Sequence, residues 1–358
     1  VHEFRSRMRG FSLIELMVAV AVLAIGLMVA IPSFNETRQR SALRGASVAI
    51  AATGALAALS ASSAFAAGTG TDVEAAAPIT VAQLTLQPSS GTTSSTTPST
   101  PAAATTSPTS RASGRIVPTP LYGVTLDDIS RLPDITTSLS KLAKMPTTRI
   151  VFDEYVAPSY YRNAAVAISK VSYVMGEILD SQYMQTVNVP GYINRTSQYL
   201  NALSDVVDIW EIGNEINGEW LGSNADVVAK MSGAYDLVKS QNKTAALTLY
   251  YNQDCWSKKS NEMFTWANAN VPYRMKQGLD YVLISYYEAD CNNLKPDWPT
   301  VFKKLAVMFP NSKIGFGEVG TTSRTQKAEY LTRYYTMKIN EPRYVGGYFW
   351  WYGRQDLV

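Results

Sequence analysis

After residue 119, short apolar runs alternate eight times with longer stretches of helical spacing, and this alternation constrains the fold more than any other feature. The runs are rich in β-branched and aromatic residues and so predict strands. They lie at 121–124, 148–153, 171–176, 208–213, 245–250, 281–285, 313–316 and 344–350. The stretches between them predict seven helices, at 134–144, 160–170, 196–207, 224–241, 262–277, 298–309 and 325–339. Strands that alternate with helices pair in parallel, and eight such units predict an α/β fold, the (β/α)8 TIM barrel.

A doubly wound open sheet is the alternative arrangement of the same elements. No Gly-x-Gly-x-x-Gly follows the first predicted strand, 121–124, so a dinucleotide site is not indicated. Because the sequence stops soon after the run 344–350, we expect the eighth helix of the barrel to be missing or very short.

Composition divides the chain at residue 118. All 7 Trp and all 21 Tyr follow that position, so the folded core belongs to residues 119–358. The net charge of +3 lies entirely in residues 1–118, which hold 8 basic and 5 acidic side chains. The neutral remainder lacks the basic surface that nucleic-acid binding needs, and we expect no nucleic-acid partner.

The front of the chain has the pattern of a membrane-targeting segment. Three arginines precede Gly10, and an apolar run, 11–34, begins Phe-Ser-Leu-Ile-Glu-Leu. A lone carboxylate in such a run, here Glu15, is costly in lipid. The segment resembles the type IV prepilin leader, which implies cleavage after Gly10, Phe11 as the new N-terminus, and pilus or secretion machinery as a partner. An ordinary membrane anchor with an incidental glutamate is the alternative.

A second signal-like segment follows the first. Basic residues precede the apolar stretch 46–59, and an Ala-x-Ala site then ends before Ala67, as in a secretory signal. Two signal-like segments in tandem indicate either a composite anchor or a start of translation that was assigned too far upstream. We therefore divide the front into a leader with its apolar helix (1–44), a second apolar segment (45–67) and a Ser/Thr/Pro/Ala-rich linker (68–118) that is too polar to form a core. Both signals predict an extracytoplasmic location, secreted or surface-anchored.

Histidine and cysteine are scarce. The only histidine is His2, which excludes a Ser-His-Asp triad and any His-ligated metal site in the body, and we expect neither metal nor cofactor. Cys255 and Cys291 follow the neighbouring strands 245–250 and 281–285. Their loops should share one rim of the barrel, where an exported chain would form a disulfide. Two unpaired thiols are the alternative.

Two carboxylates follow non-adjacent strands. Strand 208–213 continues into Asn214-Glu215, and strand 313–316 continues into Gly-Glu318. In a TIM barrel the C-terminal strand ends carry the chemistry. A pair of carboxylates there can divide acid/base work from nucleophilic work, as cleavage of a glycosidic bond requires. Glu211 has the same strand parity as Glu215, and we expect it to be a buried structural partner.

This pattern resembles the clan A glycoside hydrolases, which are retaining (β/α)8 enzymes. Their Asn-Glu ends strand four and their second Glu ends strand seven, and the resemblance covers residues 119–358. It implies that Glu215 is the acid/base, that Glu318 is the nucleophile, and that Asn214 binds the sugar 2-hydroxyl. Many relatives also carry a His near the end of strand six, which this chain lacks.

The resemblance also implies aromatic substrate contacts. A tyrosine after strand six commonly donates to the nucleophile, and here Tyr287 is the first candidate and Tyr286 the second. A tryptophan after strand eight forms the sugar platform. Trp350 is expected in that place, with Trp351 as the further candidate.

These observations together predict a retaining glycoside hydrolase that cleaves a β-linked poly- or oligosaccharide. Two alternatives stay open from the sequence. One is a non-catalytic carbohydrate-binding barrel displayed on a pilin-like anchor, which the intact carboxylate pair disfavours. The other is a structural minor pilin, which the missing pilin sheet domain disfavours.

Overall fold

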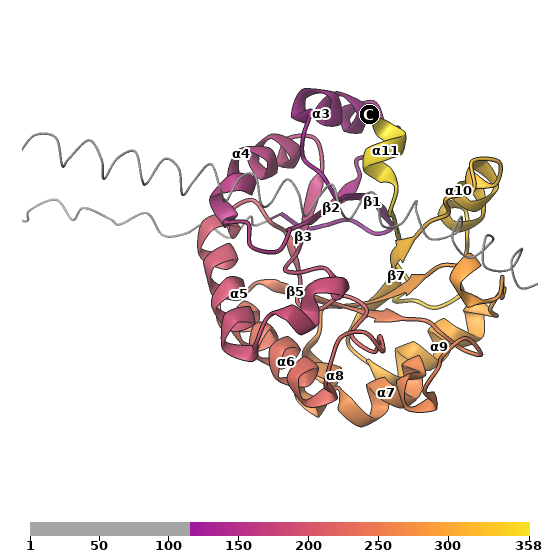
Figure 1. The fold of residues 1–358 in the computed structure, drawn as a ribbon. Helices are drawn as coiled ribbons and strands as arrows, with labels where there is room; N and C mark the ends of the chain where they lie inside the picture. Colours follow the sequence, from indigo (N-terminus) through magenta and orange to yellow (C-terminus); the bar gives the residue numbers. More distant parts are fainter. Residues whose placement is uncertain (1–114) are drawn as a thin grey trace, which may run out of the picture. The chain divides into compact units, whose positions relative to one another are not determined.

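The computed structural model describes residues 115–358, and these form a closed barrel of eight parallel strands in chain order (Figure 1). The predicted TIM barrel is confirmed. The strands are β1 (Leu121–Leu126), β2 (Thr147–Val151), β3 (Tyr173–Glu177), β4 (Ile209–Glu211), β5 (Thr244–Tyr250), β6 (Tyr281–Tyr286), β7 (Lys313–Val319) and β8 (Gly346–Trp350). The predicted leader, the second apolar segment and nearly all of the linker lie outside the described residues.

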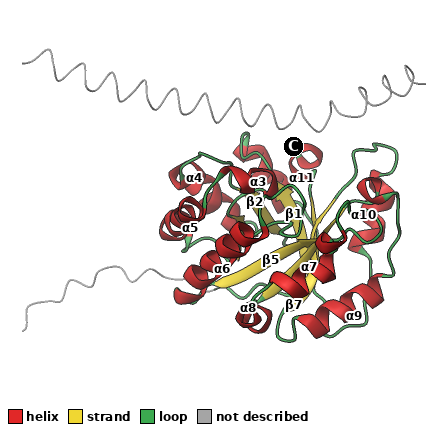
Figure 2. Cartoon of the chain, turned by 60° about the horizontal axis from the view of Figure 1, so that its bottom comes forward, coloured by secondary structure: helices red, strands yellow, loops and turns green. Residues whose placement is uncertain are grey.

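Helices surround the strands, as Figures 1 and 2 show. The α-helices are α3 (Leu132–Ser140), α4 (Pro158–Ser169), α5 (Val189–Leu203), α6 (Asn224–Ser240), α7 (Met263–Asn270), α8 (Tyr273–Gly278), α9 (Trp298–Met308), α10 (Lys327–Tyr335) and α11 (Gly353–Leu357). Three 3-10 turns, η1 (Ser181–Thr186), η2 (Lys259–Asn261) and η3 (Ala289–Cys291), lie after β3, β5 and β6.

Two predicted helices differ from the simple pattern for local reasons. The predicted helix 262–277 is two helices, α7 and α8, because Pro272 between them cannot continue a helix. Helix α5 begins at Val189, well before the predicted start, because the Asn188 side chain accepts a hydrogen bond from the Gly191 N–H and caps the first turn. Helix α11 spans only five residues, in agreement with the expected very short eighth helix.

The core has two parts because successive strand residues point to opposite faces. A small apolar cluster fills the barrel interior and includes Leu121, Met175, Ile209, Leu283 and Phe349. The larger cluster packs the outer strand faces against the helices. Towards the C-terminal strand ends the inward side chains become polar. This end, which we call the barrel mouth, holds the predicted site.

Candidate active site

A bulge in β7 directs Glu318 into the barrel. Ile284 of β6 pairs with Phe316, whereas the next residue, Ser285, pairs with Glu318, so Gly317 is an extra residue in the ladder. A Cβ at Gly317 would lie 2.8 Å from Oγ1 of Thr248, so only glycine fits without a shift. Bulges next to active sites commonly re-aim a side chain, and this one places Glu318 beside Ser285.

Glu318 is held by one hydroxyl and one cation. Its side chain is buried, Tyr287 donates its hydroxyl proton to Oε1 at 2.6 Å, and Arg149 donates through Nη1 to Oε2 at 2.7 Å. Burial raises the pKa of Glu318 above its usual value, and the Arg149 charge and the Tyr287 hydrogen bond offset part of that rise. Burial and the Glu318 charge raise the pKa of Tyr287 well above its usual value, so this hydroxyl keeps its proton and remains a donor. The expected Tyr287 bond to Glu318 is therefore present.

Glu215 lies in a different setting. It follows β4 in a left-handed conformation (φ 49°), which is rare for residues other than glycine and occurs preferentially at functional sites. Ser181 donates to Oε2 at 2.8 Å, and Ser285 donates to Oε1 at 2.7 Å. Burial, followed by the charge of Glu318, raises the pKa of Glu215 to about 8. Near neutral pH, Glu215 therefore holds a proton.

Ser285 links the two carboxylates. It is the register partner of Glu318 and the hydrogen-bond donor to Glu215. The charge of Glu318 also contributes to the raised pKa of Glu215. The structure thus brings Glu215 and Glu318 into one buried site at the barrel mouth, with unequal surroundings.

Arg149 on β2 is the shared partner of three carboxylates. It is fully buried and donates through Nε to Glu211 at 2.6 Å as well as to Glu318, while Nη2 lies 3.1 Å from Oε2 of Glu177. Glu211 also accepts from Thr248 at 2.5 Å, which confirms its expected role as a buried structural partner. Arg149 and Glu177 were not among the site residues predicted from the sequence. The sequence did contain a signal for both: Arg149 is a charged residue within the apolar run 148–153, and Glu177 directly follows the run 171–176.

Two aromatic candidates face away from the site. Tyr286 packs on Tyr251 and Trp298 in the outer layer, and its hydroxyl donates to the Leu294 carbonyl at 2.5 Å. Because residues alternate along β6, Ser285 points inward and Tyr286 points outward. Tyr286 is therefore not beside Glu318.

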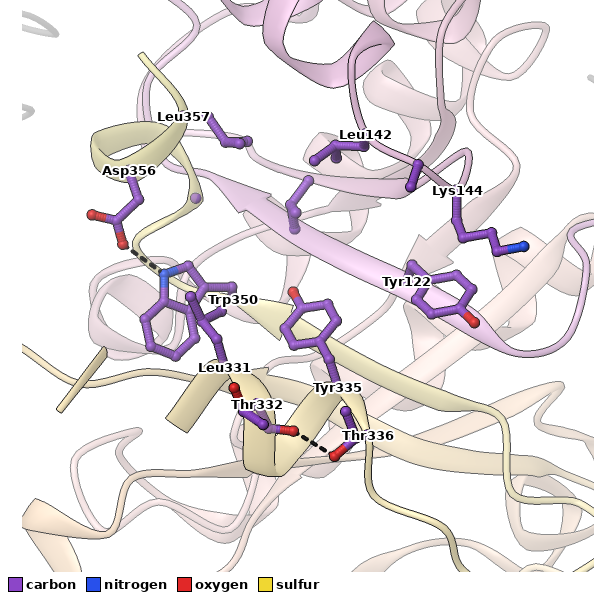
Figure 3. A pocket seen from close by; sticks show the side chains of 13 residues that line it. Tyr122, Leu142, Lys144, Leu331, Thr332, Tyr335, Thr336, Trp350, Asp356 and Leu357 are labelled. Atoms are coloured by element: carbon purple, nitrogen blue, oxygen red, sulfur yellow. Dashed lines mark hydrogen bonds between the residues drawn. The ribbon is translucent and has the colours of Figure 1, made fainter. Parts of the chain in front are cut away.

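Trp350 also lies outside the mouth. It borders a mostly apolar pocket of about 540 Å³ against β1, α10 and α11, and its Nε1 donates to Asp356 at 2.8 Å (Figure 3). The neighbouring Phe349 fills the barrel interior instead. The next inward residue is Trp351, whose ring lies 5.8 Å from the guanidinium carbon of Arg149. The expected register of Trp350 is corrected by one residue, and Trp351 is the tryptophan at the mouth.

Asn214 is buried beside Glu215 in sequence, and its Oδ1 has no hydrogen-bond partner among the described residues. A buried polar atom without a partner is costly and is commonly satisfied by a ligand or by water. Among the described residues, Asn214 therefore has one free acceptor, on the residue that directly precedes Glu215.

The rim is braced by a disulfide between Cys255, after β5, and Cys291 in η3, with Cα atoms 5.0 Å apart. The expected pairing is confirmed. Within residues 115–358, no three His, Cys, Asp or Glu side chains are grouped so that they could hold a metal ion. In the same range no helix is long and apolar enough to cross a bilayer.

The fold and site define a (β/α)8 barrel with two buried glutamates at the ends of β4 and β7. Solved structures with a similar fold include Saccharomyces cerevisiae Gas2p in complex with laminaritriose and laminaritetraose, at 12% identity and a TM-score of 0.40. That alignment covers 65% of this chain and 56% of the Gas2p chain, so this chain matches just over half of it. The apo structure of a β-glucosidase, 1317, aligns at 12% identity and a TM-score of 0.43, over 62% of this chain and 76% of that chain.

Sequence comparison identifies the front of the chain. Residues 5–31 match the prokaryotic N-terminal methylation motif, which confirms the prepilin-like leader. None of the curated proteins matches the sequence.

Proposed function

We propose that this chain is a retaining glycoside hydrolase that cleaves a β-linked poly- or oligosaccharide. The proposal rests on two buried carboxyl groups that lie in one site but have different hydrogen-bond partners and neighbouring charges. Glu318 is held by a guanidinium and a hydroxyl, whereas burial raises the pKa of Glu215 to about 8. Two such groups whose environments separate their protonation states are suited to the roles of nucleophile and acid/base.

In the first step, a carboxylate oxygen of Glu318 attacks the anomeric carbon and forms a glycosyl ester. The bond between that carbon and the glycosidic oxygen breaks, and the proton of Glu215 passes to the leaving oxygen. The protonated state of Glu215 near neutral pH supports this assignment. The Arg149 and Tyr287 bonds support an ionised Glu318.

In the second step, Glu215 is a carboxylate and takes a proton from water. The water oxygen attacks the anomeric carbon, the ester bond to Glu318 breaks, and the sugar leaves with its original anomeric configuration. Each carboxyl group then has its starting protonation state, and the reaction uses no metal or cofactor.

Two further residues serve as substrate contacts in this proposal. Asn214 accepts a hydrogen bond from the sugar 2-hydroxyl through Oδ1, an atom that has no partner among the described residues. Trp351 offers an aromatic face to the sugar ring, and the Arg149 guanidinium that bonds Glu318 lies 5.8 Å from its ring centroid, which supports this role.

The N-terminal methylation motif supports export of the enzyme through a prepilin-type leader. We propose that the segment 1–44, alone or with 45–67, anchors the barrel 119–358 at the membrane or cell surface, and that the linker 68–118 separates the two. Pilus or secretion machinery is the partner expected of the leader.

Glycosidase activity is tested with the wild-type barrel on a panel of β-linked polysaccharides and with two variants on aryl glycosides. Glu318→Ala should lose nearly all turnover, and azide should restore part of it as a glycosyl azide of inverted configuration. Glu215→Ala should lower turnover of unactivated substrates about 10²–10⁴-fold but spare the first step with a good leaving group, and azide should give a retained product.

A matched control is Glu329→Ala, which removes an exposed carboxylate from α10 and should keep wild-type activity. Sugar binding without turnover in the wild type, or normal turnover in Glu318→Ala, would contradict the proposal and favour a carbohydrate-binding barrel.

A further inference from the structure

Glu177 is a buried carboxyl group that the mechanism above does not use. It is the last residue of β3, its side chain is fully buried, and neither carboxyl oxygen has a hydrogen-bond partner among the described residues. Within residues 115–358, its one cationic contact at ion-pair distance is Nη2 of Arg149, at 3.1 Å. Glu177 also pairs in the sheet register with Glu211.

The charges of this cluster do not balance if every group is ionised. Arg149 supplies one positive charge, whereas Glu177, Glu211 and Glu318 would supply three negative charges in a buried site. A buried charge without compensation is costly, and a carboxyl group in that situation takes up a proton instead. At least one of the three glutamates is therefore expected to be neutral.

Hydrogen bonding identifies which one. Glu211 accepts two bonds from Arg149 and one from Thr248, and Glu318 accepts from Arg149 and from Tyr287. Donors of this kind stabilise the ionised form of a carboxyl group. Glu177 accepts no such bond, so its ionised form has the least support.

We propose that Glu177 is a positioning residue that carries a proton in the working enzyme, and that this proton leaves the Arg149 charge available to keep Glu318 ionised. The effect of Glu177 on the ionisation of Glu318 during catalysis rests on the proposed function. The structural part of the inference, a neutral buried carboxyl group, stands without it.

The groups that face Glu177 agree with this assignment. Arg149 from β2 is the cation within ion-pair distance, and Arg195 from α5 donates through Nε to the carbonyl of the adjacent Ile178 at 2.7 Å. Glu211 from β4, Glu318 from β7 and Asp180 from the loop after β3 are acidic. Tyr192 from α5, whose hydroxyl donates to the Ile212 carbonyl, is neutral. Burial raises the pKa of Glu177 well above its usual value, and the three neighbouring carboxylates raise it further against the effect of Arg149.

A protonated Glu177 sets the charge of the cluster through the reaction. Before attack, Arg149, Glu211 and Glu318 sum to one negative charge beside the anomeric carbon, which favours the positive transition state. Once Glu318 is esterified, the cluster is neutral. An ionised Glu177 would add a second negative charge and raise the pKa of Glu318 towards the working range, where part of the nucleophile would be protonated.

The test is the pH dependence of unfolding in Glu177→Gln. Below the ordinary glutamate pKa of about 4.3, Glu177 holds its proton in both states, and any packing effect of the glutamine is a constant offset. As pH rises, unfolded wild type loses that proton and the native state keeps it. The unfolding equilibrium constant of wild type should then rise relative to that of the variant, by up to about tenfold per pH unit until Glu177 itself ionises.

Measured from urea melts at pH 5 and pH 7, the ratio of the two constants should increase by up to about 100-fold. Glu177→Met, which also has no titrating group, should give the same trend and serves if the glutamine variant does not fold. A ratio that is constant or falls would overturn the proposal, as would failure of both variants to fold.

Glu211→Gln is the matched control. It makes the same change at the register partner on β4, but it removes a carboxylate that accepts two bonds from Arg149. It should lower the urea midpoint at pH 7 because a buried guanidinium loses its main partner.

The kinetic arm uses the acid limb of kcat/KM, which reports Glu318. This limb should keep its midpoint in Glu177→Gln, because a neutral group replaces a neutral group. A shift to lower pH would mean that Glu177 was ionised in wild type and would overturn the proposal. Unfolding needs no substrate, so failure of the glycosidase proposal and failure of this one are distinguishable.

Discussion

Removing the Tyr287 hydroxyl should displace the acid limb of the pH profile. In Tyr287→Phe, Glu318 loses a 2.6 Å hydrogen bond to Oε1 in a fully buried setting and keeps only Arg149. A hydrogen bond to a charged group contributes about 1.5–3 kcal/mol, and one pKa unit corresponds to about 1.4 kcal/mol. Because the bond favours the ionised form, its loss should raise the pKa of Glu318 by roughly one to two units.

The assay is kcat/KM of an aryl glycoside from pH 4 to 9. The midpoint of the acid limb should move up by about one to two pH units, and kcat/KM below that midpoint should fall about 10–100-fold. Tyr286→Phe makes the same chemical change one residue earlier, but its hydroxyl bonds the Leu294 carbonyl in the outer layer, so its acid limb should stay in place. An acid limb that does not move in Tyr287→Phe, or that moves equally in both variants, would show that the Tyr287 hydrogen bond does not keep Glu318 ionised.

Three further results are expected. The alkaline limb of kcat/KM should lie near pH 8, where Glu215 loses its proton. In the wild type the Ser285 hydrogen bond lowers the pKa of Glu215, so Ser285→Ala should move this limb about one pH unit higher; a limb that moves down would contradict this. Peptide mapping without reductant should recover Cys255 bonded to Cys291, and replacing both by serine should lower the unfolding free energy by about 3–4 kcal/mol for a 36-residue separation, whereas free thiols in exported protein would count against the pairing. Trp351→Ala should raise KM roughly tenfold, as expected for loss of an aromatic contact of about 1.4 kcal/mol, and an unchanged KM would remove it from the sugar site.

The barrel was predictable because its signal is repeated along the chain. Each β-strand contains the centre of a predicted run, since buried parallel strands are continuous apolar runs whatever their register. The ends of the helices were harder to predict from the sequence. The early start of α5 depends on a cap by Asn188, and the division of α7 from α8 depends on Pro272, both of which are local features within an apolar pattern.

The location of the two glutamates at the barrel mouth was predictable because both lie near the C-terminal ends of predicted strands. The bulge at Gly317 that directs Glu318 inward was not predictable. The choice between Trp350 and Trp351 was not predictable either, since it depends on strand parity. In β8, Tyr348 and Phe349 adopt positive φ values of 69° and 31°, and the pairing with β1 contains an irregularity between Tyr122 and Val124. Such a bulge has no recognisable pattern in the sequence.

The Arg149 cluster was missed for a different reason. Its members come from four strands, so no spacing along the chain connects Arg149 with Glu177, Glu211 and Glu318. A single charge in an apolar run indicates a buried partner but not its identity. Only the closed barrel, which places β2, β3, β4 and β7 around one axis, brings the four side chains together.

The anomeric configuration of the first product distinguishes a retaining from an inverting mechanism. Proton NMR of the anomeric signal, recorded during the first minutes of hydrolysis of a β-glycoside, shows which anomer is released before mutarotation. We expect the β-anomer, because Glu318 inverts the centre once and water inverts it again. Initial release of the α-anomer would mean that water attacks directly, and would contradict the assignment of Glu318 as nucleophile.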